Sequence, residues 1–389
     1  MANSEPLLHI TISIGGTYCT MDKIKLHEVK RISDYIQQDL SKAYTDVLDE
    51  GNYLRGISIT NLEKAWAKYT GAEDCCALSS GTDALHTAAM ITGIGPGDEV
   101  ICCSHSFIAT VEGFMHQGAT IRWVDSKLSD YNIDEDKIEE KITSKTKVIL
   151  WTDIYGQSPD LDKIIAIAKK HNLLTVEDAA HSAGSKFKNK KIGTFADITC
   201  FSFSEVKNFG AIGGAGAITG TKEICDEARH IKIHGRDKNL KIYNHTRLGW
   251  NRNIHTLQAA FLLAKLPYLD ELNGMKREHA KVYNNRLSNI VNKIPNEQKD
   301  RYHIYHLYPV LVDNRKELST YLNSYNIEAY GHWPKGLHEY PHTPNSDEEL
   351  INTKTITSQT ISLPCSSFLR KDEQDYIIEH IIKFYEKRG

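Results

Sequence analysis

The 389-residue sequence has no apolar run approaching the roughly 20 residues that a membrane span requires. Its first six residues also lack the basic and then apolar order of a signal peptide. We therefore expect a cytoplasmic protein with no membrane partner. The net charge is only −3, from 47 basic and 50 acidic residues. This near balance argues against nucleic acid as the main partner.

The sequence also lacks any C-x-x-C motif among its eight cysteines. Cys75 and Cys76 are adjacent, as are Cys102 and Cys103, and this spacing fits neither a zinc site nor a secreted disulfide framework. Most cysteines stand in apolar segments, so we expect reduced core residues and no metal site. Internal repeats, low-complexity tracts and long linkers are missing as well, which favours compact domains over a repeat array.

Short apolar runs alternate with helical patterns between about residues 75 and 220, which is typical of a mostly parallel sheet covered by helices. We predict a helix over residues 160–171, with Ile164 and Ala168 on its apolar face and Asn172 near its end. The predicted strands are residues 99–103, 121–124, 148–151, 173–176, 198–203 and 215–219.

A second region follows this alternation. Residues 254–272 have a helical pattern that Pro267 should kink or interrupt. Residues 304–312 are predicted to form a strand, and residues 316–324 a helix. The C-terminus should be an amphipathic helix, whose stripe including Ile377 and Ile381 favours core packing over a partner surface.

Two segments carry chemically informative side chains. Asp178 and Lys207 each stand just past a predicted strand. Ligands of open α/β sheets collect beyond the carboxyl ends of the strands, so the two side chains could meet at one site. An amine that forms an imine with an aldehyde, together with a carboxylate that keeps a pyridine nitrogen protonated, is what pyridoxal phosphate chemistry requires.

A third segment could bind the phosphate of such a cofactor. Ser80 and Asp83 have capping-box spacing at the start of a helix, and Gly81 lets the backbone approach an anion closely. Thr82 lies in the same first turn, where free N–H groups point outward. By itself the segment would fit an ordinary capped helix better than a phosphate site.

Together these segments resemble the DegT/DnrJ/EryC1/StrS sugar aminotransferases, a branch of the fold-type I pyridoxal phosphate enzymes. The resemblance covers nearly the whole chain. It rests on Ser79-Ser80-Gly81-Thr82-Asp83-Ala84-Leu85, Gly93-Ile94-Gly95-Pro96-Gly97-Asp98-Glu99, Val176-Glu177-Asp178-Ala179-Ala180-His181, Ser202-Phe203-Ser204-Glu205-Val206-Lys207-Asn208 and Gly249-Trp250-Asn251.

The resemblance implies a fold and a domain division. We expect an α/β fold-type I aminotransferase, with a mostly parallel seven-stranded sheet flanked by helices. The expected parts are an N-terminal segment, residues 1–55, packed on the main domains, a large cofactor-binding domain, residues 56–260, and a smaller C-terminal α+β domain, residues 261–389.

The resemblance also implies roles around the cofactor. Lys207 would attach it and move protons, and Asp178 would face the ring nitrogen. Ser80, Gly81, Thr82 and Ser202 would hold the phosphate. Phe107 would stack on one face of the ring and Ala180 would pack on the other, with His181 beside the ring or Asp178. The alternatives from the residues themselves are a core phenylalanine and a structural histidine.

Asn251 matches a family residue that reaches the phosphate of the neighbouring subunit, which implies a homodimer with shared sites. A helix N-cap is the alternative role for this asparagine. His332 and Trp333 match a family pair near the substrate. The family usually has an acid where Gly214 stands and an arginine where Asn253 stands.

The resulting prediction is an aminotransferase with pyridoxal 5'-phosphate as cofactor, glutamate as amino donor and a keto sugar as acceptor. In the family the acceptor is usually a nucleotide-linked 3- or 4-keto-6-deoxy sugar, used in amino sugars of surface glycans or antibiotics. The alternatives are a sugar dehydratase or lyase with the same cofactor and a non-catalytic cofactor-binding regulator. Lysine at position 207 favours transamination, because the dehydrating branch carries histidine there.

Overall fold

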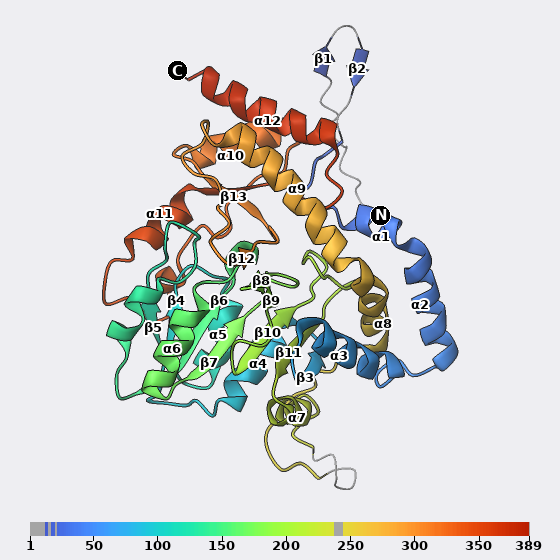
Figure 1. Ribbon diagram of the computed structural model, residues 1–389, viewed down its shortest axis with the longest axis vertical. Coiled ribbons are helices and arrows are strands. Elements are labelled where there is room, and N and C mark those ends of the chain that lie inside the picture. Colours follow the sequence, from blue (N-terminus) through green and yellow to red (C-terminus); the bar gives the residue numbers. More distant parts are fainter. Residues whose placement is uncertain (1–11, 15–16, 20–21, 237–243, 389) are drawn as a thin grey trace, which may run out of the picture.

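The computed structural model describes residues 12–14, 17–19, 22–236 and 244–388 (Figure 1). The first six residues, from which the absence of a signal peptide was predicted, lie outside these ranges. Seven of the eight cysteines are described with their side chains, and all seven are free and buried. This agrees with the expectation of reduced core cysteines.

A seven-stranded sheet forms the centre of the larger part of the molecule. Its strands run in the order β3-β11-β10-β7-β6-β4-β5. Only β11 is antiparallel to its neighbours, so the prediction of a mostly parallel seven-stranded sheet is confirmed. The strands are β3 (Asp74–Leu78), β4 (Glu99–Cys103), β5 (Thr120–Val124), β6 (Thr146–Thr152), β7 (Leu174–Asp178), β10 (Ile198–Ser202) and β11 (Gly216–Gly220).

Helices cover both faces of this sheet, and a separate apolar cluster fills each face. Trp66 and Trp151 lie in one cluster, and Phe114 and Val176 lie in the other. The helices of this part are α3 (Ile57–Thr70), α4 (Gly81–Ile91), α5 (Ala109–His116), α6 (Leu161–His171), α7 (Lys222–Ile231) and α8 (Thr256–Lys265).

The helix predicted over residues 160–171 is confirmed as α6. Asp160 caps its first turn by accepting a hydrogen bond from the Lys163 N–H group, and Asn172 ends it in the left-handed conformation with φ 53°. The pattern over residues 254–272 was only partly correct. Pro267 lies in a 3₁₀ turn, Leu266–Tyr268, that ends α8, but the following helix continues to Leu287.

The C-terminal part has its own apolar cluster, which includes Ile377 and Ile381. The prediction that the last helix packs into a core is therefore confirmed. Its elements are α9 (Leu269–Leu287), β13 (Tyr308–Leu311), α10 (Arg315–Ser324), α11 (Ile351–Gln359), β14 (Thr360–Leu363) and α12 (Lys371–Glu386). β13 and β14 form an antiparallel pair.

The strand predicted over residues 304–312 is wrong in its first half. Tyr305 has a φ of 47°, and β13 begins only at Tyr308. The Ile304 N–H group donates to Gly156 O at 3.0 Å, and Asn208 donates to Ile304 O at 3.3 Å. Hydrogen bonds to the larger part therefore replace strand pairing in this segment.

Helices α1 and α2 follow the side of the molecule, where α2 lies against α8 (Figure 1). We keep the division at residues 55 and 260 as a proposal. The remaining strands and helices are β1 (Ile12–Ile14), β2 (Thr17–Cys19), α1 (Val29–Tyr35), α2 (Gln37–Glu50), β8 (Lys186–Phe187), β9 (Lys190–Lys191) and β12 (Arg301–Tyr302). The other 3₁₀ turns are Glu135–Lys137, Glu139–Lys141, Ile154–Gly156 and Leu337–Glu339.

None of the helices formed by the described residues is both long enough and apolar enough to cross a membrane.

Candidate active site

A cavity of about 380 Å³ lies beyond the carboxyl ends of β7 and β10. This volume is in the usual range for small-molecule sites. The cavity brings together every predicted site residue except Asn251. These residues are Ser80, Gly81, Thr82, Phe107, Asp178, Ala180, His181, Ser202, Lys207, His332 and Trp333.

One end of the cavity is the N-terminus of α4. Ser80 caps this helix by accepting a hydrogen bond from the Asp83 N–H group at 3.0 Å. A Cβ atom on Gly81 would lie 2.5 Å from Ser202 Cβ, so only glycine lets the helix start so close to the end of β10. The N–H groups of Gly81 and Thr82 have no hydrogen-bond partner within the described residues. The helix dipole and these free donors make this end an anion site.

Asp178 is held in a fixed orientation at the end of β7. Its Oδ2 atom accepts a hydrogen bond from Thr110 Oγ1 at 2.6 Å, and its Oδ1 atom accepts one from the Ala180 N–H group at 3.1 Å. Burial raises the pKa of Asp178, while these two hydrogen bonds and the Lys207 charge oppose the rise. The carboxyl group is therefore positioned to face a cation in the cavity.

Lys207 stands in a tight turn after β10. Its N–H group donates to Ser204 O at 2.9 Å, and a Cβ atom on Gly210 would lie 2.4 Å from Glu205 O. Asn208 ties the turn to α9 by donating to Asn273 Oδ1 at 2.7 Å. Burial lowers the pKa of Lys207 to about 8, and the charge of Asp178 opposes this shift. About a tenth of the amine is therefore neutral and nucleophilic at pH 7.

Stacked rings form one wall of the cavity. The His181 ring centre lies 4.3 Å from that of His306 and 5.6 Å from that of Trp333. The Tyr155 N–H group donates to His181 Nδ1 at 3.4 Å. Burial, helped by the charge of Lys207, lowers the pKa of His181 well below its ordinary value. His181 is therefore a neutral ring in a packed stack.

Phe107 is not a core residue, because half of it is exposed at the cavity, with its ring centre 6.1 Å from that of Trp333. The alternative of a core phenylalanine is wrong. His332 also lines the cavity, and its Nδ1 atom is 3.1 Å from Ser362 Oγ. Burial and then the Lys207 charge lower the pKa of His332 to about 4.

Sequence reasoning missed, among others, three residues that shape this site. Thr110 orients Asp178, and His306 continues the ring stack. His27 lies over His306 with ring centres 5.6 Å apart. The hydroxyl of Thr110 could have been found, because it lies close to Phe107 in sequence. His27 carries no local signal, since a bridge between Ile24 and Ile327 brings it to the cavity from a distant segment.

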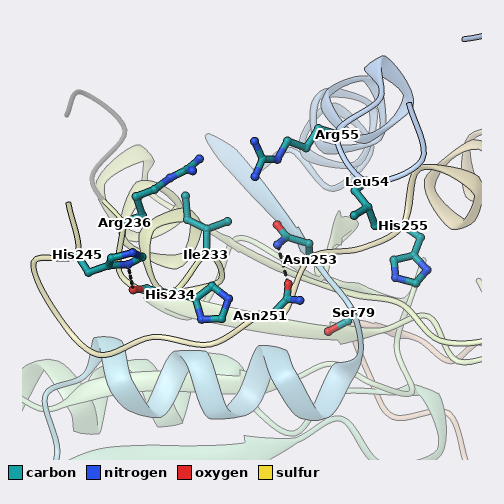
Figure 2. A pocket seen from close by; sticks show the side chains of 10 residues that line it. All are labelled: Leu54, Arg55, Ser79, Ile233, His234, Arg236, His245, Asn251, Asn253 and His255. Carbon is teal, nitrogen blue, oxygen red and sulfur yellow. Dashed lines mark hydrogen bonds between the residues drawn. The ribbon is translucent and has the colours of Figure 1, made fainter. Parts of the chain in front are cut away.

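Asn251 lies in a different pocket of about 700 Å³, here called the open pocket because most of the residues that line it are exposed (Figure 2). Its Oδ1 atom accepts a hydrogen bond from Asn253 Nδ2 at 3.1 Å. The next helix, α8, begins only at Thr256 with His255 at its cap, so the N-cap alternative for Asn251 is wrong. Arg252 points elsewhere and forms an ion pair with Asp83 at 2.9 Å.

No acidic residue is among the described residues that line this open pocket. Figure 2 shows Arg55 and Arg236 extending toward the same space from opposite sides. His234, His245 and His255 stand around its edge. The pocket therefore offers positive charge and hydrogen-bond donors to an anion. Across the described ranges, no group of three or more His, Cys, Asp or Glu side chains could hold a metal ion.

Comparison with known proteins gives consistent matches over most of the chain. The model of the DegT/DnrJ/EryC1/StrS aminotransferase family matches residues 34–382. The sequence is 34% identical to the dTDP-3-amino-3,6-dideoxy-alpha-D-galactopyranose transaminase of Aneurinibacillus thermoaerophilus, over 92% of this chain and 98% of that protein. It is 33% identical to a pleiotropic regulatory protein of Geobacillus stearothermophilus, over 90% of this chain and 96% of that protein.

The fold has solved relatives as well. The crystal structure of NtdA from Bacillus subtilis with bound cofactor PMP superposes with a TM-score of 0.86 and 30% sequence identity. The match covers 94% of this chain and 86% of that one.

Proposed function

The chain belongs to the DegT/DnrJ/EryC1/StrS aminotransferase family, and from that premise we propose that it transfers the amino group of glutamate to a nucleotide-linked keto sugar. The family assignment makes it a pyridoxal phosphate-dependent aminotransferase. The single observation that carries the proposal is the buried Lys207 amine sharing one cavity with the oriented Asp178 carboxyl.

The side chains of the cavity fit pyridoxal phosphate. The N–H groups of Gly81 and Thr82 have no partner in the part of the chain that the structure describes, and Ser202 stands beside them, so together they would hold the phosphate. Asp178 is a fixed acceptor for the ring nitrogen, and Lys207 is the amine that the aldehyde needs. When bound, the cofactor supplies an aldehyde to which amines add and a ring that accepts electrons.

Each residue of the cavity then has its own role in the proposed reaction. Lys207, with its lowered pKa, would hold the cofactor and move a proton to and from the substrate carbon. Asp178 would keep a proton on the ring nitrogen. Phe107 and Ala180 would enclose the ring from its two sides and limit water. His181 would lie beside the ring, while His332 and Trp333 would contact substrate.

We propose that a second copy of the chain completes the site. Asn251 is exposed and lies outside the cavity of its own chain. The segment around it also exposes apolar surface, since Leu248 is 87% exposed and Trp250 is 52% exposed. Exposed apolar residues of this size are typical of a protein interface, and closed twofold dimers are the commonest. Asn251 would then reach the phosphate bound in the partner's cavity.

The same arrangement would place the open pocket beside the partner's cavity. Arg55 and Arg236 would there meet the phosphates of a nucleotide-linked acceptor. The transaminase from Aneurinibacillus has a dTDP-linked sugar in its name, which supports this substrate class and a 3-keto-6-deoxy sugar.

The first test measures the half-reaction with glutamate and then screens keto sugars as acceptors. Purified protein should absorb visible light, and glutamate should change its spectrum. A dehydratase or lyase would release product without an amino donor. A non-catalytic regulator would show no half-reaction; the Geobacillus relative is named a regulatory protein.

The dimer has its own test, in which an inactive Lys207→Ala variant is mixed with an inactive Asn251→Ala variant. If sites are shared, one site of each mixed dimer carries both changes and the other carries neither. Part of the normal activity should then return. Complete absence of recovery, despite demonstrated subunit exchange, would place both residues in the same subunit's site.

A further inference from the structure

Two buried carboxyl groups lie directly behind Asp178, on the other face of the sheet. β6 and β7 are parallel neighbours in which Thr152 is opposite Asp178 and Trp151 is opposite Glu177. Successive side chains of a strand point to opposite faces. Thr152 and Asp178 line the cavity, so Glu177 points away from it. Asp153, which follows β6, lies against Glu177, and its N–H group donates to Asp178 O at 3.1 Å.

Both side chains are fully buried and have few hydrogen-bond donors nearby, among them the Trp151 indole beside both and the Ser182 hydroxyl beside Asp153. Asp153 and Glu177 are each 0% exposed. Thr199 Oγ1 donates to one oxygen of Glu177 at 2.9 Å. The other oxygen of Glu177 and both oxygens of Asp153 receive no hydrogen bond from the described residues. A buried carboxylate without donors is costly, and two such groups in contact cannot both be ionised.

A proton shared between the two groups resolves this conflict. It converts one carboxyl into a hydrogen-bond donor for the other and removes one of two like charges. Burial raises the pKa of Asp153 to about 7, and burial followed by the charge of Asp153 raises the pKa of Glu177 well above its ordinary value. The neighbouring titratable groups are Asp178 on β7 and the Cys200 thiol on β10. No cation forms an ion pair with either carboxyl in the described part of the chain.

We propose that Asp153 and Glu177 are positioning residues that share a proton behind Asp178 and extend, toward alkaline pH, the range in which Asp178 keeps the cofactor ring protonated. This inference rests on the proposed role of Asp178. At low pH both carboxyl groups are protonated and the pair is neutral. As pH rises, the pair releases one proton to solvent and keeps the other shared between the two groups, so it then carries a single negative charge. The added negative charge attracts the ring proton that Asp178 holds, so that proton is lost only at a higher pH.

The first test needs no cofactor. Infrared spectra of the cofactor-free protein should contain the C=O band of a protonated carboxyl group at pH 6, where exposed carboxyl groups are ionised. The band should be absent from the double variant Asp153→Asn/Glu177→Gln and should weaken in wild type as pH rises through neutrality. Wild-type spectra without this band, or an unchanged band in the variant, would overturn the proposal.

The second test follows the absorbance of the bound cofactor against pH. The double variant is near-isosteric and always neutral, so its alkaline transition should move to lower pH by on the order of one unit. Thermal unfolding first checks that the double variant is folded. If the double variant is not folded, the single variants Asp153→Asn and Glu177→Gln are measured in its place. An alkaline transition identical to that of wild type in a folded variant would reject the proposal.

Asp130→Asn is the matched control. Asp130 is also a buried carboxyl group, but it pairs with Lys127 at 3.3 Å in another part of the larger domain. Its substitution should leave the cofactor's alkaline transition in place. An equal shift in this control would show that loss of any buried acid has the same effect, which would also reject the proposal. A failure of Asp178→Asn to slow catalysis would instead refute the role of Asp178 and leave the infrared result standing.

Discussion

The cavity of Lys207 and the open pocket of Figure 2 differ in how far the side chains that line them are buried. In the cavity, Asp178 and His181 are buried and Lys207 is partly buried, and the protein environment shifts the pKa of each. In the open pocket, Arg55 and Asn251 are exposed. The side chains of the cavity are oriented by strand ends and fixed hydrogen bonds, whereas the side chains of the open pocket come mainly from loops.

The difference in burial bears on which of the two pockets carries out the reaction and which one recognises a ligand. A buried amine and carboxyl can be tuned by one chain alone, because desolvation and nearby dipoles decide their charge. Exposed arginines gain little until a partner or ligand removes water from them. We infer that the cavity carries the reaction and that the open pocket gains its function only in the dimer.

The largest expected effect comes from Lys207→Ala. This change removes the amine from the cavity, so turnover should fall by at least roughly four orders of magnitude. Borohydride should no longer fix the cofactor on the protein, as judged by intact mass. Lys207→Arg is the matched control, since it keeps the positive charge but loses the nucleophile. Substantial activity in the arginine variant would mean that position 207 contributes charge alone.

The next effect comes from Asp178→Asn. An amide cannot stabilise a positive ring nitrogen, so the half-reaction with glutamate should slow by roughly two to four orders of magnitude, as stopped-flow absorbance would show. Thr110→Val removes only one of the hydrogen bonds to Asp178 and should slow the reaction by about tenfold. Near-normal rates in Asp178→Asn would refute the electrostatic role of this residue.

These residues also show how far sequence could predict the site. Lys207 and Asp178 follow strands whose apolar pattern is plain, so their meeting at one sheet edge could be predicted. His27 could not, because its position depends on a single bridge between Ile24 and Ile327. The fold also contains a segment whose structure depends on contacts with distant residues and could not be predicted from its local sequence. Strand β4 was predicted with correct bounds, but the segment before Tyr308 is apolar and still forms a loop, because Asn208 and Gly156 bind its backbone.

A smaller effect concerns the stability of the cofactor-free protein. The pKa of Lys207 is about 8 when folded and about 10.5 in an unfolded chain, so the unfolded state binds more protons between these values. Stability should therefore rise with pH across this window, by on the order of 3 kcal/mol from this group.

Lys207→Met tests this. It should stabilise the cofactor-free protein below pH 8, and its advantage should disappear by about pH 10.5 in denaturant unfolding. Lys64→Met, at an exposed lysine, is the control and should show no such window. If the stability of Lys64→Met relative to wild type depended on pH in the same way as that of Lys207→Met, the amine of Lys207 would not be the source of the pH dependence.

The smallest effect should come from the open pocket and would decide whether it recognises the acceptor. In Arg55→Gln and Arg236→Gln, the KM for a nucleotide-linked keto sugar should rise by about tenfold each, the loss expected for one charge-assisted contact. The half-reaction with glutamate should keep its rate, because neither arginine lines the cavity of Lys207. A keto sugar without phosphate provides the control, since its KM should not change. If both arginine variants lose the glutamate half-reaction as well, the open pocket shapes the cavity itself, and the separation of recognition from chemistry is wrong.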